Sequence, residues 1–486
     1  MTIPKEVKSV IEGLKKAGFE AYAVGGCVRD FLRGQEPKDW DVTTNAKPEE
    51  IQKVFPESFY ENKFLTVTAK TVSKKENLKE VEITTYRTET GYSDKRHPDE
   101  VKYAKTLEED LKRRDFTVNA MALGLGSGQA YKLIDLFEGQ KDLENKTIRT
   151  VGNPDERFSE DALRMMRAIR FFSTLGFAIE KNTLEAIKKN AKLITAVSEE
   201  RIRDEFLKII MSERAYEGME ILRESGILKF IMPELLESYQ IGQNKHHIYD
   251  CWEHALLSLK YAVKKDFSQE VRLASLFHDI GKPRTKRGDG LDSTFYNHEI
   301  VGAKMTEKLM ERLKFPKKTI ENVVRLVRYH LFYYNAGEVT DSSVRRLVKN
   351  VGPENMEDLL KVRQADRIGS GVPKAEPYKL RHLKYVVDKV SQDPISAKML
   401  KINGNEIMKM LDIKPGPKVG QILDVLLEKV LQDPKNNKKE FLEKEAKKLG
   451  AISDEQLKKI ATEAKKEKEG VEVKRDEMTK QKYWVT

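Results

Sequence analysis

The sequence predicts an α+β protein in which an N-terminal mixed β-sheet is followed by an all-helical remainder. Residues 21–24, 64–69 and 81–86 are apolar or alternating stretches typical of strands, and all of them precede residue 90. From Pro154 onward, apolar residues recur at helical spacing. Charged residues make up 34% of the chain and the mean hydropathy is −0.60, which fits a soluble, helix-rich protein.

Length and composition narrow the class of protein further. With 486 residues the chain exceeds one hydrophobic core, and we expect four domains, at residues 1–145, 146–235, 236–375 and 376–486. Two cysteines in so long a chain argue against a disulfide framework and favour a cytoplasmic protein. Neither a signal peptide nor a membrane span is predicted. The net charge of +11 favours a polyanionic partner.

The remaining elements of the N-terminal half follow from local patterns. Residues 1–20 and 48–54 have the apolar spacing of helices. Residues 88–107 combine Gly, Pro and mixed charge with little periodicity, which predicts a loop. A further helix is predicted to begin at Ser159, with this serine as its N-cap.

Two aspartates stand out after the first predicted strand. Asp39 and Asp41 are two residues apart, and in an extended strand such residues point to the same face. Two carboxylates forced together repel each other unless a cation lies between them, and hard oxygen ligands suit Mg²⁺. A lone pair of this kind is common on surfaces, so its neighbours decide its meaning.

The residues just before the aspartates favour an anion. Gly25 and Gly26 allow backbone N–H groups to approach a ligand closely, and Arg29 adds a positive charge. Together with the two carboxylates, they predict a metal–triphosphate site.

Two further pairs are candidates for nucleotide recognition. Asp115 and Asn119 are four residues apart and would share a helix face, offering an acceptor and an amide to ribose hydroxyls; alternatively Asp115 caps a helix. Asp161 and Arg164 are three apart, and a carboxylate beside a guanidinium complements the Watson–Crick edges of both cytosine and adenine. Uracil and guanine would set a carbonyl against the carboxylate, at a cost of about 1–3 kcal/mol.

Four stretches of this sequence resemble the motifs of one known family. They are GGCVRD at 25–30, DWDVTT at 39–44, RRDFTVNA at 113–120 and EDALR at 160–164. They are similar to the signature motifs of class II tRNA nucleotidyltransferases and bacterial poly(A) polymerases, whose head domain is polymerase-β-like. Residues 200–210 resemble a further motif of the family, which stabilises neck helices and to which we assign no chemistry.

The resemblance implies roles for individual residues. Glu82 would be a third acidic residue across the sheet from the aspartates, Arg114 would support the ribose contacts of Asp115 and Asn119, and Asp161 and Arg164 would read the base. Arg167 and Arg170 fall where family members hold the triphosphate.

The resemblance also implies the reaction. It is template-independent completion of the 3′ CCA end of tRNA from CTP and ATP, with two Mg²⁺ ions at the aspartates. A related enzyme that adds only A, or a poly(A) polymerase, would share these motifs. Family members that add the terminal A have a flexible segment at the place of residues 88–107, so its presence favours a complete CCA or an A-adding activity.

A second group of residues points to another chemistry. Seven of the eight histidines fall between residues 246 and 382. The order of His254, His278, Asp279 and Asp366 on separate predicted helices looks like an HD-type metal phosphohydrolase domain, with these residues as ligands. His298 and His330 would then bind a second metal or a phosphate. Imidazole ligands favour Mn²⁺, Ni²⁺ or Co²⁺ over Mg²⁺.

Two interpretations of the C-terminal half stay open. The HD segment is either a phosphohydrolase that acts on tRNA 3′ ends or a scaffold without chemistry. If it is a phosphohydrolase, hydrolysis could also be the main activity of the protein, with the N-terminal head serving only to bind RNA. Residues 435–482 are crowded with Lys and Glu, and they form either a solvated helix pair or a basic surface against tRNA phosphates.

Overall fold

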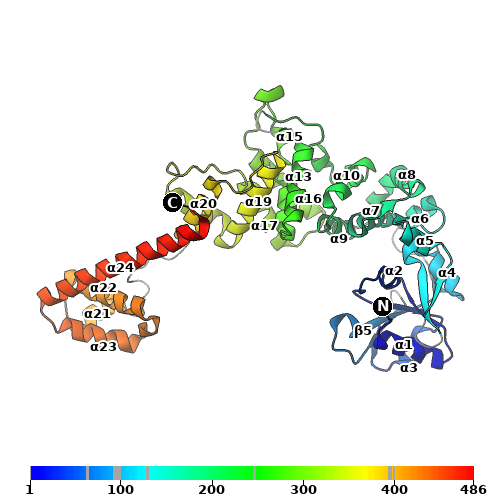
Figure 1. The fold of residues 1–486 in the computed structure, drawn as a ribbon, viewed down its shortest axis with the longest axis horizontal. Helices are drawn as coiled ribbons and strands as arrows, with labels where there is room; N and C mark the ends of the chain where they lie inside the picture. The colour runs from blue at the N-terminus through cyan, green and yellow to red at the C-terminus, as the bar shows by residue number, and fades with distance from the viewer. Residues whose placement is uncertain are drawn as a thin grey trace. The chain divides into compact units, whose positions relative to one another are not determined.

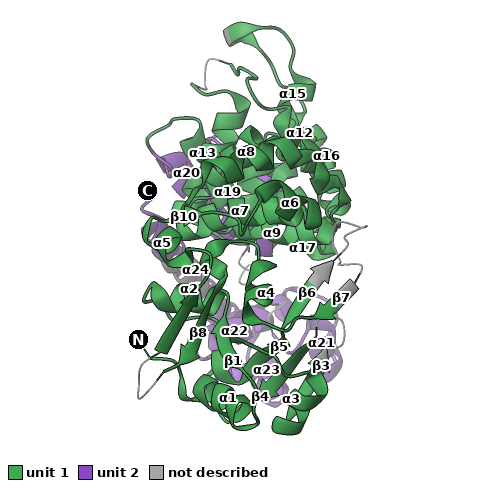
Figure 2. Cartoon of the chain, turned by 90° about the vertical axis from the view of Figure 1, so that its right-hand side faces the viewer, with its two compact units in different colours: residues 1–331, 361–373 green, residues 332–360, 374–486 purple. Residues whose placement is uncertain are grey.

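The computed structural model describes residues 2–61, 65–90, 100–126, 131–244, 248–391, 397 and 400–485. The chain forms two compact units, Met1–Leu331 with Lys361–Pro373, and Phe332–Leu360 with Lys374–Thr486 (Figure 2). The predicted α+β class is confirmed, because the main sheet lies in the N-terminal part and helices follow it (Figure 1).

One seven-stranded mixed sheet organises the N-terminal part, in the order β3-β4-β5-β2-β1-β8-β9. Its strands are β1 (Ala21–Val24), β2 (Asp41–Thr44), β3 (Ser58–Glu61), β4 (Thr66–Lys70), β5 (Glu80–Thr85), β8 (Met121–Leu125) and β9 (Tyr131–Asp135). Strands β2 and β5 pair in parallel, and the other neighbours pair antiparallel. The parallel pair sets Asp41 directly opposite Glu82.

The α-helices that accompany this sheet are α1 (Lys5–Lys16), α2 (Gly26–Leu32), α3 (Pro48–Val54), α4 (Leu107–Lys112) and α5 (Gly139–Glu144). The predicted helices at 1–20 and 48–54 are therefore confirmed. Helix α1 buries Val7, Val10, Ile11 and Leu14, whose spacing forms one apolar stripe, against the sheet core.

The prediction of a loop over residues 88–107 is wrong for the part that the structure describes. Strands β6 (Arg87–Thr90) and β7 (Glu100–Tyr103) form an antiparallel pair, and α4 begins at Leu107. Residues 91–99, the centre of the predicted loop, lie outside the described residues. The two strands form a two-stranded sheet of their own, whereas Gly, Pro and mixed charge in this stretch of the sequence had indicated a loop.

Helices dominate the rest of the first unit: α6 (Pro154–Glu160), α7 (Leu163–Leu175), α8 (Lys181–Asn190), α9 (Glu199–Ile210), α10 (Ala215–Glu224), α11 (Leu228–Ile231), α12 (Pro233–Leu236), α13 (Cys251–Lys264), α14 (Gln269–Phe277), α15 (Lys282–Thr285), α16 (His298–Arg312) and α17 (Lys317–Tyr329). Helix α19 (Met356–Gly369) is divided between the two units, and its residues from Lys361 onward belong to the first. A short parallel pair, β10 (Thr147–Ile148) with β11 (Ala178–Ile179), departs from the expected all-helical remainder. These strands have only two residues each, too few to show a strand pattern in sequence.

The predicted helix start at Ser159 is also wrong. Helix α6 is capped by Asn153, whose side chain accepts from Asp155 N, and it ends at Glu160. Asp161 is extended, and its carboxylate accepts from Leu163 N at 3.0 Å. A carboxylate bound to the backbone two residues ahead forms a turn that competes with the helix, so α7 begins anew at Leu163.

The second unit contains α18 (Asp341–Val351), α20 (Tyr378–Ser391), α21 (Gly404–Leu411), α22 (Pro417–Gln432), α23 (Lys439–Gly450) and α24 (Asp454–Tyr483). Ile407, Leu426, Leu442 and Leu457 lie in one apolar core among the last four of these helices. Among the described helices, none is both long and apolar enough to cross a membrane.

Candidate functional site

Three carboxylates meet at the edge where β2 begins. Asp41 is paired in register with Val24 of β1 on one side and with Glu82 of β5 on the other, and Asp39 lies two residues before it. Burial, followed by the charges of Asp39 and Glu82, raises the pKa of Asp41 to about 6, although Arg114 opposes this shift. The structure thus brings the predicted acidic residues together, and their mutual repulsion marks a place for a cation.

The glycine turn lies directly beside Asp41. Gly25 follows β1 with φ +84°, a conformation that side chains disfavour. A Cβ atom at Gly25 would lie 3.0 Å from Arg114 Nη1 and 3.6 Å from Asp41 Oδ2. The turn therefore keeps a space free between the acidic cluster and a guanidinium.

Asp110 in α4 holds this guanidinium, and the sequence analysis missed it. Its side chain is fully buried, accepts from Thr43 Oγ1 at 3.2 Å, and lies 2.8 Å from Arg113 Nη2 and 3.4 Å from Arg114 Nη2. It thereby links strand β2 to the arginine pair. An acid three and four residues before two arginines was the available signal.

The predicted ribose pair comes together without the predicted helix. Asp115 follows α4, and Asn119 ends a 3₁₀ helix, Thr117–Asn119, so they do not share an α-helical face as expected. Even so, Asn119 Nδ2 donates to Asp115 Oδ1 at 3.2 Å, and Arg29 Nη1 donates to Asn119 Oδ1 at 2.8 Å. Despite its burial, the charge of Arg167 lowers the pKa of Asp115 to about 2.

The predicted base-reading side chains are held by separate partners. Asp161 Oδ2 lies 2.7 Å from Arg201 Nη2, whereas Arg164 Nη1 lies 2.6 Å from Glu160 Oε2. Arg164 also donates to the Arg113 carbonyl at 3.0 Å. Arg201, in the motif to which we assigned no chemistry, therefore orients a candidate reader.

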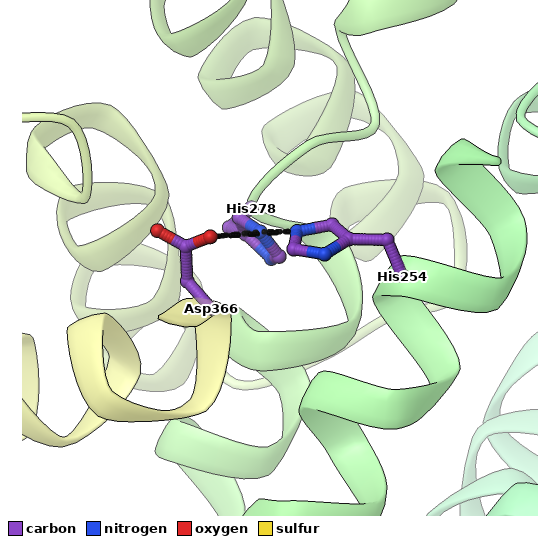
Figure 3. A group of neighbouring side chains, drawn as sticks. All are labelled: His254, His278 and Asp366. Carbon is purple, nitrogen blue, oxygen red and sulfur yellow. Dashed lines mark hydrogen bonds and ion pairs between the residues drawn. The ribbon is translucent and has the colours of Figure 1, made fainter. Parts of the chain in front are cut away.

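A second polar centre lies in the helical part of the first unit. His254 of α13, His278 at the end of α14 and Asp366 of α19 point toward one another (Figure 3). His254 Nε2 lies 2.9 Å from His278 Nε2 and 3.5 Å from Asp366 Oδ1. The predicted fourth member, Asp279, places Oδ2 at 3.1 Å from His254 Nε2.

A second group shares Asp279. Its other oxygen, Oδ1, lies 3.3 Å from His298 Nε2 and 3.6 Å from His330 Nε2. The sequence analysis predicted that these two histidines bind either a second metal or a phosphate. Each oxygen of the Asp279 carboxylate therefore has its own pair of imidazoles.

The histidine tautomers fit metal ligands. Nδ1 of His278, His298 and His330 lies 2.9, 2.7 and 2.7 Å from the carbonyl oxygens of Ser275, Phe295 and Val327. A ring nitrogen this close to a carbonyl carries the proton, which leaves each Nε2 with a lone pair facing the centre. Nε2 of His298 and Nε2 of His330 lie 3.3 Å apart, and two lone pairs this close need a cation or a proton between them.

The charge state of the centre points the same way. Burial lowers the pKa of His254, but hydrogen bonds to Asp279 and Asp366 outweigh it and raise the value to about 9. The pKa of Asp279 is well below its usual range because of Lys282 and the neighbouring imidazoles, which overcome its burial. Carboxylates that stay ionised beside imidazole nitrogens are a ligand set that suits divalent cations.

A cavity of about 490 Å³ opens onto this centre. Lys282 and Arg363 supply positive charge to its lining, and Phe295 and Tyr296 supply aromatic rings. Lys282 Nζ lies 2.6 Å from Asp279 Oδ2. The cavity therefore joins a candidate metal centre to groups that suit an anionic, ring-bearing ligand.

Comparisons with known families match three parts of the chain. A "Poly A polymerase head domain" model matches residues 21–149, and the "Probable RNA and SrmB- binding site of polymerase A" matches residues 176–238. A model of "tRNA nucleotidyltransferase domain 2" matches residues 295–446. The first match covers the acidic cluster and the glycine turn.

Whole-chain relatives agree with these matches. A CCA-adding enzyme of Ligilactobacillus salivarius is 35% identical over 92% of this chain and 98% of its own length. One from Streptococcus suis is 34% identical over 86% of this chain and 90% of its own. The crystal structure of the Bacillus stearothermophilus CCA-adding enzyme in complex with CTP superposes with a TM-score of 0.59, at 27% identity, over 92% of this chain and 98% of that one. At this identity and coverage, the chain belongs to the family of CCA-adding enzymes, which are nucleotidyltransferases.

Proposed function

We propose that the carboxylates of Asp39, Asp41 and Glu82 carry the chemistry by which this chain completes the 3′ CCA end of tRNA from CTP and ATP. The observation that carries the proposal is the acidic cluster in register across β2 and β5, next to the Gly25 turn. The related B. stearothermophilus structure contains CTP, which supports CTP as a substrate.

Asp39 and Asp41 would hold two Mg²⁺ ions, since the ligand set consists of carboxylate oxygens alone. When bound, the metals activate the primer 3′-hydroxyl and stabilise the displaced pyrophosphate. Gly26, Arg29 and Arg114 would receive the triphosphate beside the Gly25 turn. Further guanidinium groups come from α7, at Arg167 and Arg170.

Recognition of the nucleotide would use two sets of residues. Asp115 and Asn119, already hydrogen-bonded to each other, would contact the ribose hydroxyls. Asp161 and Arg164 would read the base edge, one as acceptor and the other as donor. Because Arg201 and Glu160 hold these readers separately, the same edge can serve cytosine and adenine in turn.

The experiment that tests the reaction uses three tRNA transcripts. They end at the discriminator nucleotide, after CC, and with complete CCA, and the products formed with CTP and ATP are sequenced. CCA addition predicts completion of the first two and no extension of the third. An A-adding enzyme would extend only the second, and a poly(A) polymerase would extend all three with A.

Arg164→Ala is expected to change nucleotide selection more than nucleotide affinity. The guanidinium contacts the base edge in the proposal, so its loss removes a discrimination of about 1–3 kcal/mol. UTP and GTP incorporation should rise relative to CTP and ATP in single-nucleotide kinetics. An equal fall for all four nucleotides would contradict the role of Arg164 as a base reader.

A second candidate activity is a metal-dependent phosphohydrolase at the centre around Asp279. The observation that favours it is that each oxygen of the Asp279 carboxylate faces two imidazole groups. Mn²⁺, Ni²⁺ or Co²⁺ would suit these nitrogen ligands and would supply a nucleophilic hydroxide when bound. The substrate would be a tRNA end with a terminal or 2′,3′-cyclic phosphate, which lacks the free 3′-hydroxyl needed for addition.

The four-domain division, the cytoplasmic location and a tRNA-binding role for residues 376–486 also belong to this proposal. Both cysteines are free and buried, which supports a reducing compartment. The third family model extends to residue 446, well into the second unit, which supports a part for these helices in binding tRNA.

A further inference from the structure

Three of the arginines that we propose to bind the triphosphate lie around the same aromatic ring, that of Phe171. The guanidinium carbon of Arg170 lies 4.0 Å from the ring centroid of Phe171, and those of Arg29 and Arg167 lie at 5.3 and 5.7 Å. Arg29 comes from α2, and the other two come from α7. Phe171 itself is only 4% exposed.

Each of these arginines also has a carboxylate of its own. The pairs are Arg29 with Asp30 at 2.8 Å, Arg167 with Asp115 at 2.5 Å, and Arg170 with Glu205 at 2.9 Å. The carboxylates balance three positive charges that would otherwise repel one another. They do not explain why the three guanidinium groups converge, because they lie on three different segments.

The ring explains the convergence. The negative face of an aromatic ring attracts guanidinium groups without taking up any of their N–H donors. Phe171 is fixed in turn by Phe116, which is fully buried and meets it edge to face at 5.6 Å and 86°. Phe116 follows Asp115 directly, so the ring is anchored beside the proposed ribose contact.

We propose that Phe171 is a positioning residue that gathers Arg29, Arg167 and Arg170 for the triphosphate of the incoming nucleotide. This inference rests on the proposed function, which assigns the triphosphate to these arginines. Because the triphosphate is common to CTP and ATP, Phe171 affects the binding of both equally and leaves base selection unchanged.

The test compares Phe171→Leu with Phe172→Leu in the full-length protein. Phe172 is the matched control, since its ring lies 4.1 Å from Arg214, which we place in no site. Phe171→Leu should raise KM for CTP and for ATP about 5- to 10-fold. Its kcat should stay within about twofold, and the preference for CTP over UTP should not change, whereas Phe172→Leu should match the wild type.

A second arm keeps the shape of the ring and thus avoids a folding defect. Incorporating phenylalanine with one to five ring fluorines at position 171 weakens the negative face stepwise. KM for both nucleotides should rise with each fluorine, while thermal unfolding stays near that of the wild type. A KM that does not respond to fluorination, or equal KM values in the two leucine variants, would overturn the inference.

Arg170→Ala separates this inference from the proposal beneath it. If this variant keeps the wild-type KM, the triphosphate assignment itself is wrong. If it raises KM while the fluorinated series does not, the arginine binds the nucleotide and only the role of Phe171 fails.

Discussion

Asp41→Asn should abolish nucleotide addition, with a loss of about a thousandfold or more, because the carboxylate contacts the proposed catalytic metals. The amide keeps the size of the side chain but removes the charge. Folding should be preserved, because burial and the negative charges of Asp39 and Glu82 disfavour the ionised form of Asp41, so the folded state does not depend on this charge. Rates of CTP incorporation and thermal unfolding measure the two effects.

The acidic pair Glu80 and Glu82 provides a matched control for this prediction. Both are exposed on β5, and only Glu82 lies opposite Asp41. Glu82→Gln should therefore impair addition, whereas Glu80→Gln should not. Asp41→Asn with a tenth of the wild-type rate, or equal effects of the two glutamine variants, would refute the proposed metal site.

The raised pKa of Asp41 also sets a pH dependence. Below about pH 6 this carboxyl gains a proton in the metal-free protein, and a proton competes with a cation for the same oxygen. The Mg²⁺ concentration needed for half-maximal activity should therefore rise as the pH falls through 6. This dependence should be absent well above pH 7, where Asp41 is ionised.

Asp279→Asn should eliminate metal binding at the histidine centre and leave CCA addition intact. One oxygen of Asp279 faces His254 and the other faces His298, so a single change weakens both groups. We expect two Mn²⁺ ions per chain at this centre in the wild type, none in Asp279→Asn, and one in His330→Ala. Hydrolysis of 2′,3′-cyclic AMP should be lost in the first variant.

Metal content and turnover of the purified variants decide this prediction. His382→Ala is the control, because this histidine packs among tyrosines of α20 and belongs to neither group of candidate metal ligands. Equal metal content in wild type and Asp279→Asn would contradict the proposed ligands. If the protein binds no metal and shows no turnover with Mn²⁺, Ni²⁺, Co²⁺ or Mg²⁺, this segment is a scaffold without chemistry.

Local patterns predicted the elements whose signal comes from one buried face. The apolar stripe of α1 was evident because this helix packs one side against the sheet. Strands β6 and β7 were missed, because Gly, Pro and mixed charge in residues 88–107 indicated a loop. The break at Asp161 was missed because a side-chain hydrogen bond to Leu163 N, and not apolar spacing, ends α6 there.

By itself the sequence determined the α+β class, the acidic pair, the glycine turn and the histidine-rich segment, because each depends on residue type and short spacing. Only the tertiary structure decided which distant residues meet. Asp279 joins two groups of histidines from α13, α14, α16 and the end of α17, and Arg201 reaches Asp161 across 40 positions of sequence. Such contacts follow from how helices pack against one another, and no local pattern in the chain encodes that packing.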